Sequence, residues 1–280
     1  MVCDTQIIAG EARSKTKELS KELNIGLDSL MFFDDNPVER AEVRLNAPEV
    51  AVIEVPESAS DYGAALFASG FFDKPSLSRE DQQRSSLYQG ESARKQLRSD
   101  GASMEEFLMS LEMKVEIGSA DRSTINRITQ LVTKTNQFNL TTNRHNQVTL
   151  QSMADSDEWC VRWTRLFDRF GDSGLIGVTI TQYVGTIARI DSFVMSCRVM
   201  NRLVENAMLC DILQIAVKKG VSEVVAEYVP TDRNAAISGF YSDFGFEPEA
   251  NNPGSGILYR TGIDRLIETI HWPNSIALID

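Results

Sequence analysis

The stretch TIARIDSFVMSCRVMNRLVENAMLCDILQIAVKKG, residues 186–220, places a strand directly before a helix. Its first third is an apolar run typical of a buried strand. From about residue 200 the pattern becomes helical, and the helix ends favourably at Lys218, Lys219 and Gly220, because cations and a glycine suit a helix C-terminus. The stretch therefore predicts a strand–helix unit from which the fold can be followed in both directions.

Strands and helices alternate on both sides of this unit. Strands are expected at 114–118 (KVEIG), 175–182 (LIGVTITQ), 221–229 (VSEVVAEYV) and, as the last one, 256–260 (GILYR). The apolar residues Ile125, Ile128, Leu131 and Val132 mark a helix, and Asp232 or Asn234 is expected to cap a short helix through Tyr241.

A boundary between two domains is indicated near residue 103. Ser103 and Glu106 form a capping box, and apolar residues at helical spacing follow it. Polar, helix-forming stretches precede it. We therefore expect a helical linker at 61–103 and a second domain at 104–280.

The first 60 residues resemble a fragment of a parallel α/β sheet. SLMFF (29–33) predicts a buried strand that ends at Asp34 and Asp35, Asn36 can cap the next helix, and VAVIEVP (50–56) predicts another strand. The order indicates that part of a larger sheet lies upstream.

Composition excludes several classes of function. A net charge of −12 and a pI near 4.8 disfavour binding to nucleic acid, whose phosphates are bound through Lys and Arg. No apolar run approaches the ~20 residues of a membrane-spanning helix. The four cysteines form no CxxC pair, and the N-terminus lacks the pattern of a secretion signal, so a cytoplasmic protein is expected.

Several stretches together resemble the FkbH-like family, which joins a haloacid-dehalogenase (HAD) phosphatase domain to a GNAT-like acyltransferase domain. They are FFDDNPVERAEVR (32–44), QLVTKTNQFNLTT (130–142), DRFGDSGLIGV (168–178) and IDSFVMSCRVM (190–200). The resemblance implies a partial, Rossmann-like HAD fragment followed by a GNAT-like α+β domain with a mixed, splayed sheet. It also implies a small acyl substrate, glyceryl or related, on an acyl carrier protein in polyketide or nonribosomal-peptide assembly.

Asp34 and Asp35 match the last acidic motif of HAD enzymes, whose carboxylates hold Mg²⁺. The aspartyl nucleophile of such enzymes lies far upstream in a DxD motif, whereas 33 residues precede Asp34 here. The DxD of this chain, Asp155 and Asp157, lies in a polar loop without a preceding strand. We expect no phosphatase activity from this chain and a Mg²⁺ site only if another polypeptide completes it.

The GNAT resemblance places a phosphate-binding loop at the start of the helix after 186–197. In GNAT enzymes two central strands separate, the acyl-thioester arm pairs with the exposed edge, and the pyrophosphate lies at a helix N-terminus. Arg198, Asn201 and Arg202 match that position. The family glycines are replaced, however, by Asn201 and Leu203, which favours the single phosphate of a carrier-bound phosphopantetheine over CoA.

Three residues are catalytic candidates by the same analogy. Tyr241 matches the acid that protonates the leaving thiolate, Glu227 is a candidate general base, and Cys197 a candidate acyl acceptor. Asn234 matches a contact to the pantetheine arm. Each has a structural alternative: Tyr241 as a core residue, Glu227 as a solvated carboxylate and Cys197 as a buried thiol.

The histidines are given no catalytic role at this stage. His145 lies in the polar loop TTNRHNQ and is expected at the surface, and no Ser/His/Asp arrangement is indicated. The leading hypothesis is an acyltransferase that takes a thioester from a carrier protein. The alternatives are a noncatalytic carrier-docking module and a magnesium phosphatase completed by a second chain.

Overall fold

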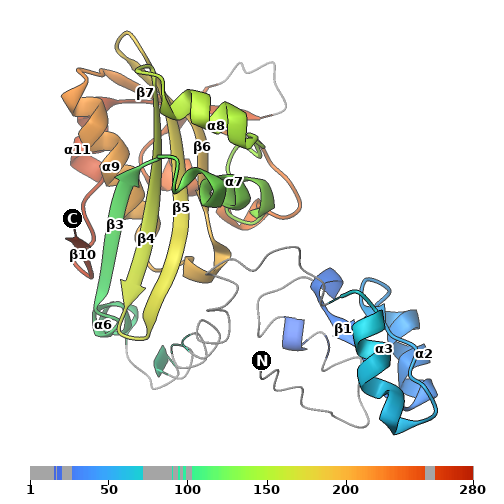
Figure 1. The fold of residues 1–280 in the computed structure, drawn as a ribbon. Coiled ribbons are helices and arrows are strands. Elements are labelled where there is room, and N and C mark those ends of the chain that lie inside the picture. Colours follow the sequence, from blue (N-terminus) through green and yellow to red (C-terminus); the bar gives the residue numbers. More distant parts are fainter. Residues whose placement is uncertain are drawn as a thin grey trace. The chain divides into compact units, whose positions relative to one another are not determined.

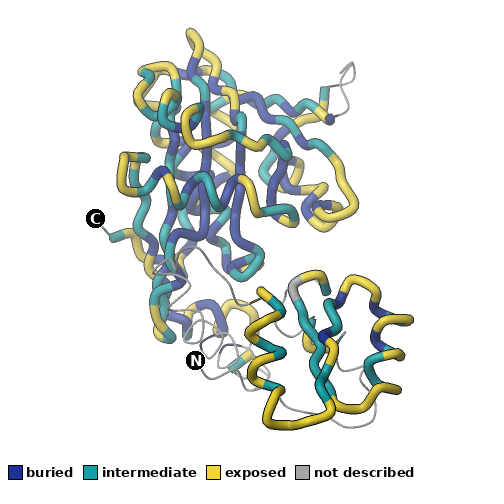
Figure 2. Tube along the Cα trace, turned by 45° about the vertical axis from the view of Figure 1, so that its right-hand side comes forward, coloured by how far each residue is buried: buried dark blue, intermediate teal, exposed yellow. Residues whose placement is uncertain are grey.

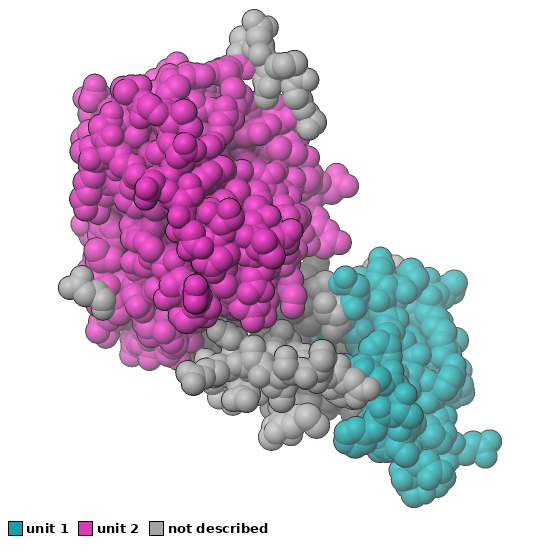
Figure 3. All heavy atoms as spheres, turned by 45° about the horizontal axis from the view of Figure 1, so that its top comes forward, with its two compact units in different colours: residues 1–89 teal, residues 90–280 magenta. Residues whose placement is uncertain are grey.

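The structure, a computed structural model, describes residues 16, 18–20, 27–71, 90, 94, 97, 98, 103–249 and 256–279. The chain forms two compact units, Met1–Gln89 and Gly90–Asp280 (Figure 3). The division falls within the expected linker, most of which lies outside the described residues.

The first unit contains a small βαβ arrangement. Its strands are β1 (Met31–Phe32) and β2 (Ala51–Val52), and its helices are α2 (Pro37–Asn46) and α3 (Tyr62–Ala68), with short 3-10 turns at Leu27–Ser29 and Ala59–Asp61. The two strands pair in parallel. Asn36 caps α2 by accepting a hydrogen bond from the Val38 amide at 3.0 Å, as the sequence predicts. The arrangement is an α/β fragment and identifies no larger fold.

The second unit is built on one mixed sheet in the order β10-β3-β4-β5-β6-β7-β9-β8 (Figure 1). Its strands are β3 (Met113–Ser119), β4 (Trp159–Asp168), β5 (Gly171–Val184), β6 (Ile187–Met195), β7 (Glu223–Tyr228), β8 (Glu247–Pro248), β9 (Ile257–Gly262) and β10 (Ile276–Ile279). Two neighbouring pairs, β10 with β3 and β6 with β7, run parallel, and the other pairs run antiparallel.

Helices cover both faces of this sheet. They are α6 (Met104–Ser110), α7 (Ile125–Lys134), α8 (Gln147–Ala154), α9 (Val204–Lys218), α10 (Phe240–Asp243) and α11 (Ile263–Thr269), with 3-10 turns at Cys197–Val199 and Ala235–Ile237. The capping box of Ser103 and Glu106 begins α6, which confirms the prediction.

The apolar side chains form two cores in this unit, and Figure 2 shows the buried strands between more exposed helices. Phe193 and Met195 of β6 belong to the core beneath α9, and Val194 between them belongs to the core beneath α7. Because successive side chains of a strand point to opposite faces, the two cores lie on opposite faces of the sheet.

Several elements differ from the sequence-based expectation, among them α8, α11 and β8, which were not predicted. GILYR is not the last strand, because β10 follows it and pairs with β3 at the other edge of the sheet. Strand β4 was not predicted. Helix α9 begins at Val204 and not near residue 200, because the chain first makes a 3-10 turn at Cys197–Val199. No helix among the described residues is long and apolar enough to cross a membrane.

Candidate functional site

The parallel strands β6 and β7 separate partway along their length. They pair from Ile187 opposite Glu223 to Ile190 opposite Ala226, and the pairing stops there. A β-bulge in β6 at this point leaves Asp191 without a partner residue on β5. Bulges re-aim strands and side chains. The sheet therefore contains the separated pair of strands expected from the sequence, with Asp191 at the apex of the opening.

The opening is filled by residues 138–141 of the same chain, here named the inserted segment. The Met195 amide donates to the Phe138 carbonyl at 2.9 Å, and the Leu140 amide donates to the Phe193 carbonyl at 3.3 Å. On the other side, the Val229 amide donates to the Leu140 carbonyl at 2.8 Å. The segment thus binds the exposed edge of β6 and the chain just after β7.

Asn234 fastens the inserted segment from the β7 side. Its buried side-chain amide donates to the carbonyl of Asn139 at 3.0 Å and to that of Val229 at 2.9 Å. Its oxygen accepts from the Thr231 amide at 2.7 Å and from the Tyr228 hydroxyl at 3.1 Å. These bonds use both donors and both lone pairs of the amide. Asn234 is therefore occupied with the chain itself, and its contact to a pantetheine arm stays a prediction.

The loop before α9 has an unusual backbone. Asn201 and Leu203 have φ angles of 62° and 61°, the left-handed region that glycine adopts without strain. These are the two positions where the GNAT pattern has small or glycine residues. The sequence change therefore leaves the backbone in the glycine-like conformation, which costs leucine in particular about 1–2 kcal/mol. Strain of this kind is found where function requires a particular backbone.

A small hollow opens beside this loop. Its lining includes Met200 and Asn201 from the loop and Gly239 and Phe240 from the start of α10. Two carboxylates, Glu205 and Asp243, also line it.

The Glu205 carboxyl is the more buried of these groups. Burial raises its pKa, and one of its oxygens has no hydrogen-bond partner among the described residues. The exposed carboxylate of Asp243 disfavours a ligand with many phosphates at this place, and the raised pKa of Glu205 makes its contribution to this repulsion smaller.

Tyr241 and Glu227 lie close enough to interact electrostatically. The Tyr241 ring is fully buried and packs against Phe246 and Tyr259. Its pKa is raised by burial first and then by the charge of Glu227. Its hydroxyl has no partner among the described residues. Tyr241 is thus surrounded as a core residue is. Its role as the general acid, and that of Glu227 as the general base, stay predictions.

The two loop arginines differ in their surroundings. Arg202 is buried beside Asp168, at 3.5 Å, and donates to the Arg198 carbonyl at 2.9 Å, while Arg94 binds the same carboxylate through two hydrogen bonds. Arg202 therefore stabilises the loop from within. Arg198 is half-buried and lies in the 3-10 turn with half-buried Cys197. Phosphate binding by either arginine and acylation of Cys197 stay predictions.

His145 does not lie free at the surface, which corrects the sequence-based expectation. Its Nε2 lies 2.6 Å from Oδ2 of Asp191, and 18% of each side chain is exposed. Asn143 donates to the Asp191 carbonyl at 3.0 Å, and Ser192 donates to Oδ2 at 2.8 Å. The order differs from a nucleophilic triad, because the carboxylate and not the imidazole contacts the serine.

The hydrogen bond to Asp191 raises the pKa of His145, against the effect of burial. For Asp191, burial alone would raise the pKa, but hydrogen bonds from His145 and Ser192 outweigh it and lower the pKa. Sequence reasoning missed this pair, since its members are 46 positions apart.

In the first unit, Asp34 and Asp35 lie at the turn before α2. Oδ1 of Asp34 accepts from the Asn36 amide at 2.8 Å, and Arg40 donates to the backbone carbonyls of both aspartates. Among the residues described by the structure, no group of three or more His, Cys, Asp or Glu side chains is placed to hold a metal ion. Their assignment to Mg²⁺ stays a prediction.

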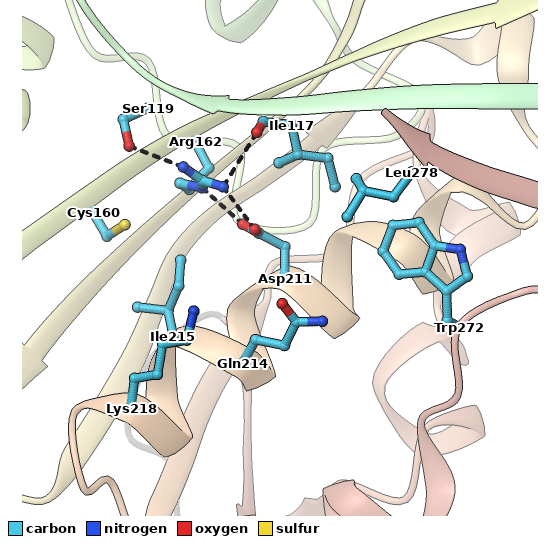
Figure 4. Close-up of a pocket in the computed structure, with 10 residues that line it drawn as sticks. All are labelled: Ile117, Ser119, Cys160, Arg162, Asp211, Gln214, Ile215, Lys218, Trp272 and Leu278. Atoms are coloured by element: carbon cyan, nitrogen blue, oxygen red, sulfur yellow. Dashed lines mark hydrogen bonds and ion pairs between the residues drawn. The ribbon is translucent and has the colours of Figure 1, made fainter. Parts of the chain in front are cut away.

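A larger cavity, of about 410 Å³, lies between α9 and the strands β10, β3 and β4 of the sheet (Figure 4). Arg162 dominates its polar lining, but its guanidinium is already held by two hydrogen bonds to Asp211, at 2.8 and 2.9 Å, and by one to Ser119. None of the site residues predicted from the sequence lines this cavity. We therefore place the candidate site at the β6–β7 opening.

Comparisons with known proteins give similarity to solved structures over about half of the chain. Neither protein-family models nor curated protein sequences give a match. Among solved structures, the ribosomal-protein-S18-alanine N-acetyltransferase of Escherichia coli aligns at 16% identity over 53% of this chain and 94% of its own, with a TM-score of 0.42. The PaiA N-acetyltransferase of Thermoplasma acidophilum, solved with coenzyme A, aligns at 14% identity over 53% and 98%, with a TM-score of 0.39. The GNAT domain of S. lividans PAT aligns at 12% identity over 52% of this chain and 89% of its own, with a TM-score of 0.43. Likenesses of this size carry no argument about activity.

Proposed function

We propose that the second unit is a GNAT-type acyltransferase that takes its acyl group from a phosphopantetheine thioester. The observation that carries the proposal is the backbone of the loop before α9. Asn201 and Leu203 hold glycine-like φ angles beside the opening between β6 and β7. Asparagine tolerates such an angle, but leucine is strained at it, and strain of this kind is a reason to propose a functional role for the loop.

The carrier-bound form of the thioester suits the site better than CoA does. Asp243 lines the hollow next to the loop as an exposed carboxylate, which disfavours additional phosphates there; Glu205 adds less, because burial raises its pKa. A phosphopantetheine on a carrier protein brings one phosphate, and a half-buried arginine, Arg198, lies in the same loop. This favours the acyl carrier protein of the FkbH-like interpretation over CoA as the source of the thioester, and the glyceryl or related acyl unit is proposed from the resemblance alone.

A second candidate function is a noncatalytic module that binds a carrier protein. The inserted segment favours it, because residues 138–141 occupy the edge of β6 with which a pantetheine arm would pair. In this interpretation the segment stays in place and the carrier is recognised on the surface.

Binding measurements separate the two functions. The full chain is titrated calorimetrically with acetyl-CoA, with free phosphopantetheine, and with the apo and holo forms of an acyl carrier protein. Acyl transfer predicts tighter binding of the holo form than of the apo form. It also predicts faster hydrogen exchange at the Leu140 and Val229 amides in the complex, because the arm displaces the inserted segment.

Equal affinity for apo and holo carrier, with unchanged exchange at those amides, would refute the acyltransferase and support the docking module. Leu203→Ala is a matched variant of the loop, since it keeps a Cβ and the strain but removes the larger side chain.

A further inference from the structure

We infer that His145, held by Asp191, is the general base that removes a proton from the acyl acceptor. The inference rests on the proposed acyl transfer and names the residue that activates its second substrate. It replaces Glu227, the candidate base that the sequence suggests.

The first step concerns where the acyl group of a bound thioester would lie. The loop before α9 follows the end of β6, and Asp191 lies at the apex of the opening, five residues before Ser196. At about 3.3 Å per residue the distance along the strand is about 17 Å. A thioester with its phosphate at the loop and its arm along β6, where it takes the place of the inserted segment, therefore brings its acyl end to the apex.

The second step concerns the face from which an acceptor can approach. Val194 belongs to the core beneath α7, and His145 lies in the connection from α7 to α8. Asn143, in the same connection, also bonds to Asp191. The hollow beside α9 borders Phe240, which belongs to the core on the other face. The histidine and the donor's hollow thus approach the opening from opposite faces of the sheet, as two substrates of a direct transfer require.

The third step concerns the chemistry of the imidazole. Nε2 lies 2.6 Å from the Asp191 carboxylate, which accepts its proton and fixes the tautomer with the lone pair on Nδ1. Nδ1 has no hydrogen-bond partner among the described residues. The side chain is 18% exposed, so part of the ring faces solvent.

The proposed step balances as follows. The acceptor's lone pair forms the bond to the acyl carbon, and the carbon–sulfur bond breaks with its electron pair remaining on sulfur. The proton of the acceptor passes to Nδ1 of His145 and then to the thiolate or to solvent. Asp191 is a positioning residue, because it acts through the imidazole.

Within the part of the chain that the structure describes, few charged groups act on the imidazole of His145. Asp191 is the ionised group that acts on its pKa among the described residues. Arg144, its neighbour in the chain, turns away and donates to the carbonyls of Val132 and Thr135. The pH dependence of the step should therefore follow the pair of His145 and Asp191.

The experiment measures free thiol released from acetyl-CoA, and from an acetylated holo-carrier protein, with water or ethanolamine as the acceptor. His145→Gln should slow release at least a hundredfold, the usual range for a lost general base, without changing thioester affinity more than threefold. His271→Gln, at the other histidine, is the matched control and should leave the rate unchanged.

The pH profile separates catalysis from structural support. The wild-type rate should rise with pH and level off above the pKa of His145, which its partner holds above the ordinary value. Asp191→Asn should move this inflection to lower pH, which a purely structural role would not do. If His145→Gln does not fold, the Asp191→Asn profile decides.

The outcomes are distinct. A wild-type chain that binds neither thioester overturns the proposed function and this inference with it. A chain that binds a thioester but releases no thiol above the uncatalysed rate refutes the base and favours the docking module. An active His145→Gln variant with the wild-type rate and profile refutes the base alone.

Discussion

Replacing Asn234 by alanine tests whether the inserted segment is held as the structure shows. The side chain makes four hydrogen bonds, to the Asn139 and Val229 carbonyls, the Thr231 amide and the Tyr228 hydroxyl. Each contributes about 1 kcal/mol net, and partners left buried without water cost more. We expect Asn234→Ala to lower the free energy of unfolding of the second unit by about 3–4 kcal/mol.

Tryptophan fluorescence in urea measures this loss for the second unit, since all three tryptophans of the chain belong to it: Trp159, Trp163 and Trp272. Asn274→Ala, at an exposed turn, is the control and should change stability by less than about 0.5 kcal/mol. If Asn234→Ala lowers the free energy of unfolding no more than this control does, the side-chain amide of Asn234 does not hold the inserted segment in place.

The remaining predictions concern backbone strain, a buried hydroxyl and pH. Leu203→Gly should cost about 1 kcal/mol less of the free energy of unfolding than Leu203→Ala in urea titrations, because both variants lose the contacts of this side chain with the core and only glycine relieves the left-handed strain; an equal or larger loss for glycine would refute the strain. Tyr241→Phe should leave stability unchanged or raise it by up to about 1 kcal/mol, since it removes a hydroxyl without a partner among the described residues. The raised pKa of His145 means that its pair with Asp191 stabilises the fold fully below about pH 6.5 and less as pH rises through the folded-state pKa. Urea midpoints between pH 5 and 9 should show this decline in wild type and His271→Gln, and a flatter profile in His145→Gln.

Local signals in the sequence predicted the elements that local chemistry controls. The capping box of Ser103 and Glu106 predicts the start of α6, and Asn36 predicts the start of α2. Each depends on residues within one turn of the chain. The separation of β6 and β7 was expected from the family resemblance, because periodicity alone does not show where two strands part.

The inserted segment shows what could not be predicted. Its sequence, FNLT, was noticed as part of a distinctive stretch, but nothing local indicates its place in the sheet. Asn139 contacts Asn234 across 95 positions, and the backbone of Leu140 bonds to Phe193 and Val229, which lie 53 and 89 positions away. The sequence gives His145 no catalytic role for the same reason. Its partner, Asp191, lies in a distant strand, and no apolar pattern marks the loop that contains His145.

The two candidate functions predict different changes in binding affinity when the inserted segment is held less tightly. If a thioester arm pairs with β6, it must first displace residues 138–141, and its apparent affinity falls by the fraction of molecules in which the segment is out. Asn234→Ala removes part of that cost and should therefore strengthen thioester binding even as it weakens the fold. A docking module recognises the closed surface, so the same substitution should leave carrier binding unchanged or weaken it. The sign of the change in affinity therefore distinguishes the two functions, when it is measured under conditions in which wild type and Asn234→Ala are both folded. Stronger binding supports the acyltransferase, and unchanged or weaker binding supports the docking module.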